Sequence, residues 1–295
     1  MKAVPTDVST PWSQPWTLAA PLTLDGVGLH SGRPALVRVV PAPAGHGLVF
    51  HRVDLPGAPA IPARADLVTE TLLSTTLAVG EARVQTVEHL LAALWGMGIS
   101  DARIEVDGPE VPVLDGSARP YVEAILEIGV TVLPGTRLVL ALPEASRVDG
   151  DKRIRVTPDT VCRLTYDVDY GHPLAGPQTF TLELTPATFA SELASARTFG
   201  FVRDVEAMRA AGLAKGGSVE NAIVIGEESY SSPLRYADEL VRHKILDLVG
   251  DFALLGAHWT GHVRVSKGGH KLHNDLAREL AGLLPALTGA GMAGR

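Results

Sequence analysis

The pattern of apolar and polar positions predicts short strands in both halves of the chain. β-branched and other apolar residues gather in short runs, and several of these runs follow one another with no helical pattern between them. Strands connected in this way form mostly antiparallel sheets. The predicted strands cover residues 35–40, 102–106, 136–142, 154–157, 162–168 and 179–184.

Helical periodicity, in which apolar residues recur at intervals of three and four, predicts two well-defined helices. The first covers residues 84–95, with Thr86 as the expected cap at its start. The second covers residues 236–255. Shorter helices are predicted at residues 121–128, 186–194 and 205–211.

A Leu-Pro-Gly sequence at residues 133–135 interrupts the pattern between two regular regions, so we place a domain boundary there. The predicted fold class is α+β, with one domain at residues 17–134 and a second at 135–287. Residues 1–16 are rich in Pro, Ser and Thr, and residues 288–295 are rich in Gly and Ala. We expect both ends to be flexible tails.

The composition narrows the class of function. Of the 295 residues, 46% are hydrophobic and 20% are charged, which is typical of a globular protein and excludes a disordered one. The net charge of −7 gives no support to nucleic-acid binding. The single cysteine, Cys162, excludes an intramolecular disulfide and a thiolate-rich metal site. Any metal must therefore be held by carboxylates and by some of the ten histidines.

Membrane and export signals are not expected in this sequence. No run of about eighteen apolar residues occurs, so we expect no transmembrane helix. The first residues lack the apolar stretch and cleavage site of a signal peptide. We therefore expect a cytoplasmic protein.

Glu88 and His89 are adjacent near the start of the first long helix, off its apolar stripe. A metal bound by His89 would have a carboxylate beside it, and that carboxylate could take a proton from a metal-bound water. Taken alone, the pair is better explained as an ordinary helix start, where the helix dipole favours a glutamate.

His243, Asp247 and Asp251 recur at every fourth position of the second long helix, roughly opposite its apolar residues. Since one turn holds about 3.6 residues, His243 and Asp247 can share one metal, and Asp251 would lie just beyond it. Taken alone, this pattern is better explained as the solvated face of an amphipathic helix.

His270 lies in a glycine-flanked loop between a predicted strand and a helix, and Thr198 precedes Phe199 in a predicted loop or strand. Each position has an ordinary explanation when it is considered alone. Together, the four segments supply a complete hydrolytic site. Two histidines and an aspartate make a three-ligand zinc site with an open fourth position, while Glu88 can act as a base and His270 as an acid.

The order and spacing of these segments resemble those of the UDP-3-O-acyl-N-acetylglucosamine deacetylases of bacterial lipid A synthesis. The resemblance extends from about residue 21 to about residue 284, and its specificity comes from the set of segments, because no single one is specific. The matching segments are 26–32 (GVGLHSG), 86–90 (TVEHL), 113–117 (VLDGS), 196–200 (ARTFG), 216–218 (GGS) with 221–222 (NA), 241–247 (VRHKILD) and 269–270 (GH).

The resemblance implies a fold of two similar domains, each a mostly antiparallel β-sheet packed with two helices. Each domain carries an insert, and the active site lies between the domains. The resemblance places a zinc ion on His89, His243 and Asp247. Fe²⁺ can occupy a site of this kind in the cell, since geometry and metal availability decide occupancy as much as affinity does.

For catalysis, the resemblance makes Glu88 the general base and His270 the general acid. Asp251 would orient His270, and Thr198 would donate a hydrogen bond to the oxyanion. An insert at about residues 200–230 would form the passage for the acyl chain. The residues implied to contact the substrate are Lys244, Phe199, Leu72, Gly217, Asp169 and Tyr170.

The implied reaction is zinc-dependent hydrolysis of the N-acetyl group of a UDP-3-O-[(3R)-3-hydroxyacyl]-N-acetylglucosamine, the committed step of lipid A synthesis. The implied protein is a monomer with an acylated UDP-sugar as its substrate, no nucleic-acid partner and no stable membrane anchor. Two alternatives stay open. One is a zinc amidohydrolase that acts on another acylated amide, and the other is a non-catalytic relative that binds a sugar nucleotide or a lipid.

Overall fold

A computed structural model of the chain describes residues 12–289, with side chains up to residue 283. The predicted tails at residues 1–11 and 290–295 lie outside the described residues. The fold is α+β, and its sheets are mostly antiparallel. Within residues 12–289, no helix is both long enough and apolar enough to cross a membrane.

The first half of the chain forms a five-stranded sheet, a three-stranded sheet, a strand pair and two helices. The strand order of the larger sheet is β2-β3-β9-β4-β5. The elements are β1 (Trp16–Leu18), β2 (Leu22–Val27), β3 (Pro34–Pro41), β4 (Leu48–Arg52), β5 (Ala60–Pro62), η1 (Ala65–Leu67), β6 (Val68–Glu70), β7 (Thr76–Val79), β8 (Ala82–Val84), α1 (Glu88–Gly96), β9 (Ala102–Asp107), α2 (Arg119–Ile128) and β10 (Val130–Val132).

The second half forms a six-stranded sheet, a short strand pair and four helices. The strand order of the six-stranded sheet is β12-β13-β18-β14-β15, and its sixth strand, β11, pairs with β18. The elements are β11 (Val139–Ala141), β12 (Ala145–Asp149), β13 (Lys152–Thr157), β14 (Cys162–Val168), β15 (Gln178–Glu183), α3 (Pro186–Thr188), η2 (Phe189–Leu193), β16 (Phe199–Phe201), α4 (Val202–Ala210), β17 (Ile223–Ile225), α5 (Glu239–Ala253), β18 (His258–Ser266) and α6 (His270–Gly289).

The two larger sheets share one topology. In each, the strand that comes last in the sequence lies in the middle, β9 in the first half and β18 in the second. β9 is antiparallel to β3 and parallel to β4. In the same way, β18 is antiparallel to β13 and parallel to β14. The prediction of two similar domains is therefore confirmed by strand order and direction.

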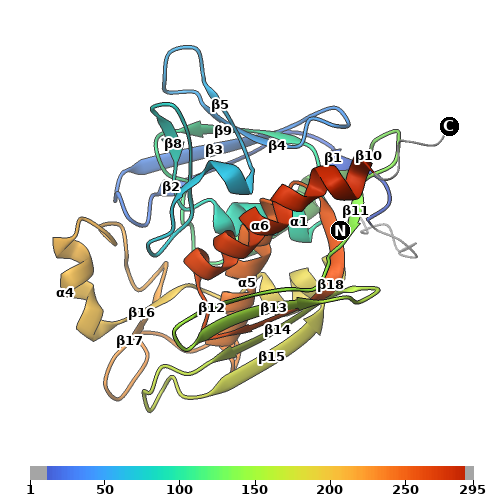
Figure 1. The fold of residues 1–295 in the computed structure, drawn as a ribbon. Coiled ribbons are helices and arrows are strands. Elements are labelled where there is room, and N and C mark those ends of the chain that lie inside the picture. The colour runs from blue at the N-terminus through green and yellow to red at the C-terminus, as the bar shows by residue number, and fades with distance from the viewer. Residues whose placement is uncertain (1–11, 290–295) are drawn as a thin grey trace.

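Alternation of apolar and polar residues explains why one face of each sheet is covered. In β3, Ala35, Val37 and Val39 are buried, while the residues between them are exposed. A strand of this kind packs one face on the core and exposes the other. Figure 1 shows the helices α1, α5 and α6 between the sheet of the first half and that of the second.

The central contact of the fold is the packing of α1 against α5. All nine residues of α1 are buried, as are all residues of α5 except Arg242 and Lys244. Gly250 allows the close approach, because a Cβ atom there would lie 2.7 Å from the carbonyl carbon of Glu88. The polar side of α5 therefore lies in the interior. If this side carried no functional site, it would be expected to face solvent.

The start of α1 differs from the prediction. The helix begins at Glu88, and the residue at its N-terminal cap is Val87, with no side-chain hydrogen bond. Thr86 has a positive φ of 58° and lies outside the helix. Its hydroxyl donates instead to Oε1 of Glu110, at 2.9 Å. The prediction of Thr86 as a helix cap is wrong because this carboxylate, which is distant in sequence, takes its hydroxyl.

Residues 12–16 and 288–289, which the prediction assigned to the two tails, belong to ordered structure. The Trp12 ring stacks on that of Trp95, with centroids 5.6 Å apart, and Trp16 begins β1, which pairs with β10. Residues 12–16 therefore do not form a flexible tail. At the other end, α6 continues to Gly289, two residues into the predicted tail.

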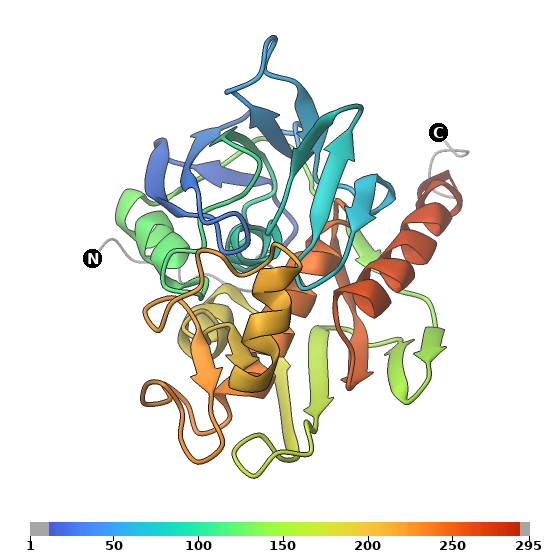
Figure 2. The same ribbon diagram turned by 90° about the vertical axis from the view of Figure 1, so that its left-hand side faces the viewer.

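The insert of the second half projects beside the first half. It comprises β16, α4, the segment that follows, and β17, and Figure 2 shows α4 on the side facing the viewer. The backbone amides of Lys215 and Gly216 donate to the carbonyls of His30 and Leu29. The insert is thus tied to the loop at residues 28–32 of the first half.

Candidate active site

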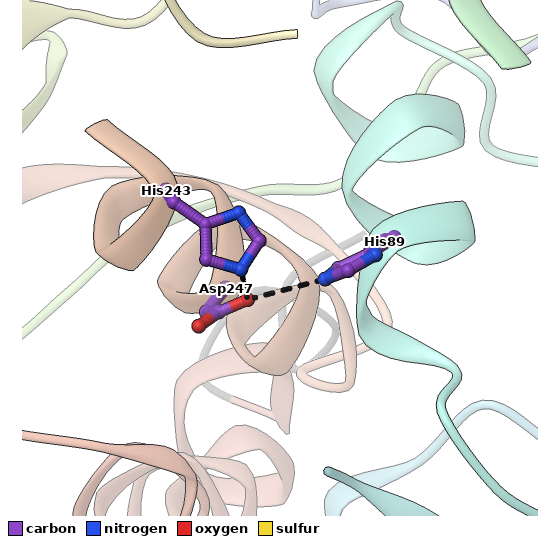
Figure 3. A group of neighbouring side chains, drawn as sticks. All are labelled: His89, His243 and Asp247. Carbon is purple, nitrogen blue, oxygen red and sulfur yellow. Dashed lines mark ion pairs between the residues drawn. The ribbon is translucent and has the colours of Figure 1, made fainter. Parts of the chain in front are cut away.

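Three buried side chains from α1 and α5 gather at the junction of the two halves. Figure 3 shows His89 from α1 facing His243 and Asp247 from α5. Oδ1 of Asp247 lies 3.3 Å from Nε2 of His243 and 3.6 Å from Nε2 of His89. The two imidazole rings meet edge to face, with centroids 5.0 Å apart.

The hydrogen bonds around these residues leave their inward-facing atoms available as ligands. Nδ1 of His243 donates to the carbonyl of Ala196 at 3.1 Å, so its Nε2 carries a lone pair in the neutral ring. Burial lowers the pKa of His243 to about 3, which keeps the ring neutral. Oδ2 of Asp247 accepts from Nζ of Lys244 at 2.6 Å. Oδ1 of Asp247 is buried and has no hydrogen-bond partner among the described residues.

This donor set fits a divalent cation. Two imidazole nitrogens and one carboxylate oxygen point toward a common space, and a buried carboxylate oxygen without a partner is costly unless it binds something. Burial alone would raise the pKa of Asp247, but the neighbouring ammonium of Lys244 holds it well below its ordinary value. Asp247 and His243 are therefore already in the protonation states that a metal requires of its ligands.

Glu88 and His270 face each other beside this cluster. Oε2 of Glu88 accepts from the backbone amide of Thr75 at 3.0 Å, and Oε1 lies 3.9 Å from Nε2 of His270. Burial raises the pKa of Glu88. Burial would lower the pKa of His270, but the carboxylate of Asp251 raises it to about 9. The pair thus combines a carboxylate of increased basicity with a histidine that is protonated at neutral pH.

Asp251 holds His270 through a network that joins four parts of the chain. Its Oδ2 accepts from Nδ1 of His270 at 2.8 Å and from Nδ1 of His273 at 2.9 Å. Its Oδ1 accepts from the hydroxyl of Thr75 at 2.5 Å. Nε2 of His273 is in turn 3.0 Å from the hydroxyl of Tyr166. His270 is therefore fixed in orientation, with Nε2 directed at Glu88.

Thr75 and His273 belong to this site although the sequence analysis did not select them. His273 lies three residues after His270 in α6, so helical spacing on a shared face was an available signal. Thr75 had no such signal, because it reaches Asp251 only through tertiary packing. His270 itself is the first residue of α6, and not part of a loop as predicted.

A pocket of about 300 Å³ opens onto the cluster. It brings together most of the residues predicted for catalysis and metal binding, along with residues that the sequence analysis did not select. Its lining consists of Leu29, Thr71, Leu73, Glu88, His89, Asp149, Lys152, Thr198, Phe199, Lys244, Asp247, Gly269, His270, Lys271 and Leu272. A larger cavity of about 1220 Å³ lies elsewhere, and none of the predicted site residues lines it.

Four of the residues predicted to contact the substrate, Leu72, Gly217, Asp169 and Tyr170, do not line the pocket. Leu72 is 69% exposed, whereas its two neighbours line the pocket. A Cβ atom at Gly217 would lie 3.8 Å from the side chain of Leu29. The ring of Tyr170 packs against that of Phe199, with centroids 5.5 Å apart. Asp169 is exposed and accepts from the backbone amide of Gly171.

The fold and the site fit the class of metal-dependent deacetylases, in which a His/Asp ligand group lies beside a carboxylate and a histidine. Residues 16–282 match the model of the UDP-3-O-acyl N-acetylglycosamine deacetylase family. The chain belongs to that family.

Curated relatives agree with this assignment along nearly their whole length. The chain is 47% identical to the UDP-3-O-acyl-N-acetylglucosamine deacetylase of Citrifermentans bemidjiense, over 90% of this chain and 88% of the relative. It is 48% identical to the protein of that name from Myxococcus xanthus, over 90% and 85%. It is 45% identical to the one from a Nostoc species, over 90% and 98%.

Proposed function

We propose that this chain is a zinc-dependent deacetylase that hydrolyses the N-acetyl group of a UDP-3-O-[(3R)-3-hydroxyacyl]-N-acetylglucosamine. The products are acetate and the free 2-amino sugar nucleotide, in the committed step of lipid A synthesis. The observation that carries the proposal is a buried His-His-Asp group beside Glu88 and a protonated His270, with a pocket that opens onto them. The names of the relatives supply the substrate class.

His89, His243 and Asp247 would hold the metal, and the unpartnered Oδ1 of Asp247 is consistent with this role. A bound zinc ion lowers the pKa of a coordinated water to about 7 and polarises a substrate carbonyl. The absence of thiolate ligands leaves Fe²⁺ as a second metal that the same residues would accept.

The protein's own groups perform the proton transfers. Glu88 accepts the proton of the attacking water through its Oε1, because its Oε2 is engaged by Thr75. Thr198, which lines the pocket, donates to the acetamide oxygen as that atom becomes negative. His270 delivers the proton on Nε2 to the amine nitrogen, which otherwise leaves poorly. Asp251 keeps His270 charged and oriented until that step.

Lys244 and Phe199 would contact the substrate at the pocket, where Nζ of Lys244 lies 6.0 Å from the centre of the Phe199 ring. Lys152 and Lys271 also line the pocket and would attract the diphosphate of a sugar nucleotide. Leu72, Gly217 and the insert at about residues 200–230 would form the acyl passage.

Asp169 and Tyr170 are proposed to contact the nucleotide, and the ring of Tyr170 meets that of Phe199 edge to face. The net charge of −7 supports a protein that does not bind nucleic acid. We further propose a cytoplasmic monomer without a stable membrane anchor, the setting expected for an enzyme acting on a UDP-sugar.

Metal removal tests the reaction and the cofactor together. We expect one tightly bound zinc per chain, release of acetate from UDP-3-O-acyl-N-acetylglucosamine, loss of activity on chelation and recovery on adding Zn²⁺. Metal analysis and an acetate assay measure these quantities. Zinc without acetate release would indicate another amide substrate, and a folded protein that takes up no zinc would contradict the metal site.

The pH dependence of kcat/KM should be bell-shaped, because the base must be ionised and the acid protonated. Activity rises as the pH increases through the raised pKa of Glu88. Activity falls again as the pH rises past the pKa of His270. Without a metal this pKa is raised to about 9, and the positive charge of a bound metal would lower it. His270→Ala should remove the alkaline limb and lower kcat/KM by about 10²- to 10⁴-fold.

The matched control for this profile is His262→Ala. His262 is a half-buried histidine on β18 whose Nε2 is hydrogen bonded to Thr165, and it does not line the pocket. This variant should keep the wild-type profile. If the pH profile of the wild-type protein has only one limb, and His270→Ala has the same profile, His270 is excluded as the acid.

A further inference from the structure

The segment at residues 196–198 carries two groups on which the site depends. The carbonyl of Ala196 accepts from Nδ1 of His243 and so sets which nitrogen of that ring faces the metal position. Thr198, two residues later, lines the pocket. The residue between them, Arg197, neither lines the pocket nor contacts a proposed metal ligand, yet it is buried. The question is what holds this short segment in place.

A buried ion pair fixes Arg197 to the start of α5. Oε1 of Glu239 accepts from the backbone amide of Arg197 at 3.0 Å and from its Nε at 2.9 Å. Oε2 accepts from Nη2 of Arg197 at 3.1 Å. The side chains are only 8% and 0% exposed. A two-point pairing of this kind fixes direction as well as distance.

The rest of the guanidinium is also engaged. Nη1 of Arg197 donates to Ser232, and Nη2 donates to the carbonyl of Pro233, both at 2.8 Å. Oε2 of Glu239 also accepts from the backbone amide of Arg235 at 2.6 Å. The pair therefore joins the segment at 196–198 to the chain that leads into α5.

Glu239 and His243 lie one helical turn apart on α5. Residues spaced by four lie on the same face of a helix. Glu239 binds the backbone amide of Arg197, and His243 binds the carbonyl of the preceding residue, Ala196. These two contacts hold the segment along the helix face that carries Asp247 one turn further on.

The first half of the chain completes the arrangement. The backbone amide of Thr198 donates to the carbonyl of Gly116 at 2.8 Å. Nη2 of Arg235 lies 2.9 Å from Oδ2 of Asp115 in the same loop. Gly116 has a φ of 82°, and a Cβ there would collide with the backbone of Asn221. Thr198 is thus held between the two halves, and it follows Arg197 directly in the chain.

We propose that Arg197 and Glu239 are positioning residues for the reaction, which fix Thr198 at the pocket and hold His243 in its ligand tautomer. The inference rests on the proposed function for its catalytic consequence. It adds to that function two residues that touch neither substrate nor metal. Arg197 stands within the 196–200 motif and Glu239 just before the 241–247 motif, so the pair also explains why these two segments act together.

Glu239→Gln tests the proposal with almost no change in shape. Both carboxylate oxygens of Glu239 accept hydrogen bonds, Oε1 from Arg197 and Oε2 from Arg197 and Arg235. In the variant, one of these oxygens becomes an amide NH₂ group, which would face N–H donors and could not accept from them. The segment must therefore shift. We expect a fall in kcat of about 10- to 100-fold, with KM changed much less. Arg197→Lys keeps the charge but loses the two-point pairing, and it should lower kcat in the same way. This second variant tests the proposal if Glu239→Gln folds poorly.

Asp54→Asn is the matched control. Asp54 pairs with the buried Arg52 through two hydrogen bonds of 2.8 and 2.7 Å, and neither residue lines the pocket. This variant disturbs a two-point ion pair in the first half of the chain. It should leave kcat within about twofold of wild type. Equal losses of kcat in Asp54→Asn and Glu239→Gln would overturn the proposal.

A double-mutant cycle shows whether Glu239 acts through Thr198. Thr198→Val should lower kcat by about 100-fold in the wild-type protein and clearly less when Glu239→Gln is present, because the hydroxyl is then already misplaced. In Asp54→Asn the loss should remain complete. If Thr198→Val lowers kcat by the same factor in the wild type, in Glu239→Gln and in Asp54→Asn, Glu239 does not act through Thr198. That result would overturn the proposal.

Binding of Co²⁺ supplies a measurement that needs no turnover. Its visible spectrum depends on ligand geometry. Glu239→Gln should weaken Co²⁺ binding about tenfold and alter the spectrum, and Asp54→Asn should do neither. If the wild-type protein binds Co²⁺ but releases no acetate with any metal, the proposed function fails. The spectrum of Glu239→Gln still decides the positioning role, and an unchanged spectrum and affinity would count against it.

Discussion

Replacing Glu88 by Gln should lower kcat about a thousandfold while the protein keeps its metal. The substitution preserves the shape of the side chain and an oxygen that can accept from the amide of Thr75. It removes the negative charge and the capacity to take up a proton. Burial raises the pKa of Glu88, which makes the native carboxylate a stronger base than an exposed glutamate. Glu88→Ala should abolish turnover in the same way.

Two measurements separate a base from a ligand. Metal analysis of Glu88→Gln should give the wild-type content, because Glu88 is not part of the His-His-Asp group. Glu81→Gln is the control, since Glu81 is exposed in the turn between β7 and β8 and should leave kcat unchanged. Loss of metal from Glu88→Gln would make Glu88 a ligand or a structural residue, and wild-type kcat would place the base elsewhere.

The ligand group on α5 could be predicted from the sequence because helical periodicity is a local property. His243, Asp247 and Asp251 fall at intervals of four, and the helix at residues 239–253 lies within the predicted range of 236–255. The strands at 154–157 and 162–168 were predictable for the same reason. What local periodicity could not decide was whether this polar face meets water or another helix.

Several features that the sequence did not reveal depend on contacts between distant segments. Thr86 was expected to cap α1, but its hydroxyl is taken by Glu110. Trp12 was placed in a tail, but its ring stacks on Trp95. Lys152 reaches the pocket from the β12–β13 hairpin. No spacing rule predicts such pairings, because they arise only when sheets and helices pack together.

The roles within the candidate site came mostly from resemblance, and the geometry supplies physical reasons for them. His270 was proposed as an acid, and the hydrogen bond from its Nδ1 to Asp251 explains why it holds a proton. The contribution of Thr75 to that network could not have been anticipated, since it joins residues 176 positions apart. The site chemistry was thus proposed from motifs, whereas the contact of Thr75 that supports His270 is visible only in three dimensions.

Replacing Gly250 by Ala should damage both the fold and the metal site, because both depend on the approach of α1 to α5. The added Cβ would lie 2.7 Å from the carbonyl carbon of Glu88 and 2.8 Å from its Cα, and these are backbone atoms that cannot rotate away. Alanine in a helix is intrinsically favoured over glycine by about 1 kcal/mol. Forcing the helices apart costs about 3 kcal/mol, so the net loss of stability should be about 2 kcal/mol.

The same displacement should separate His89 from His243 and Asp247, because the first ligand lies on α1 and the other two lie on α5. A misplacement of about 1 Å can cost about a hundredfold in activity, and we expect a loss of that size in kcat together with weaker metal binding. Denaturant unfolding, metal titration and the acetate assay measure the three effects.

Gly282→Ala is the matched control for this prediction. Gly282 lies in α6, and outside its own stretch of helix no described atom is within 4 Å of its ideal Cβ, so this variant should gain about 1 kcal/mol and keep its metal affinity. If Gly250→Ala behaves like Gly282→Ala, the two helices do not meet in solution as they do here. If Gly250→Ala loses stability but keeps metal affinity and kcat, α1 moves without separating the ligands. The glycine would then matter for packing alone, and the link between helix approach and metal binding would be wrong.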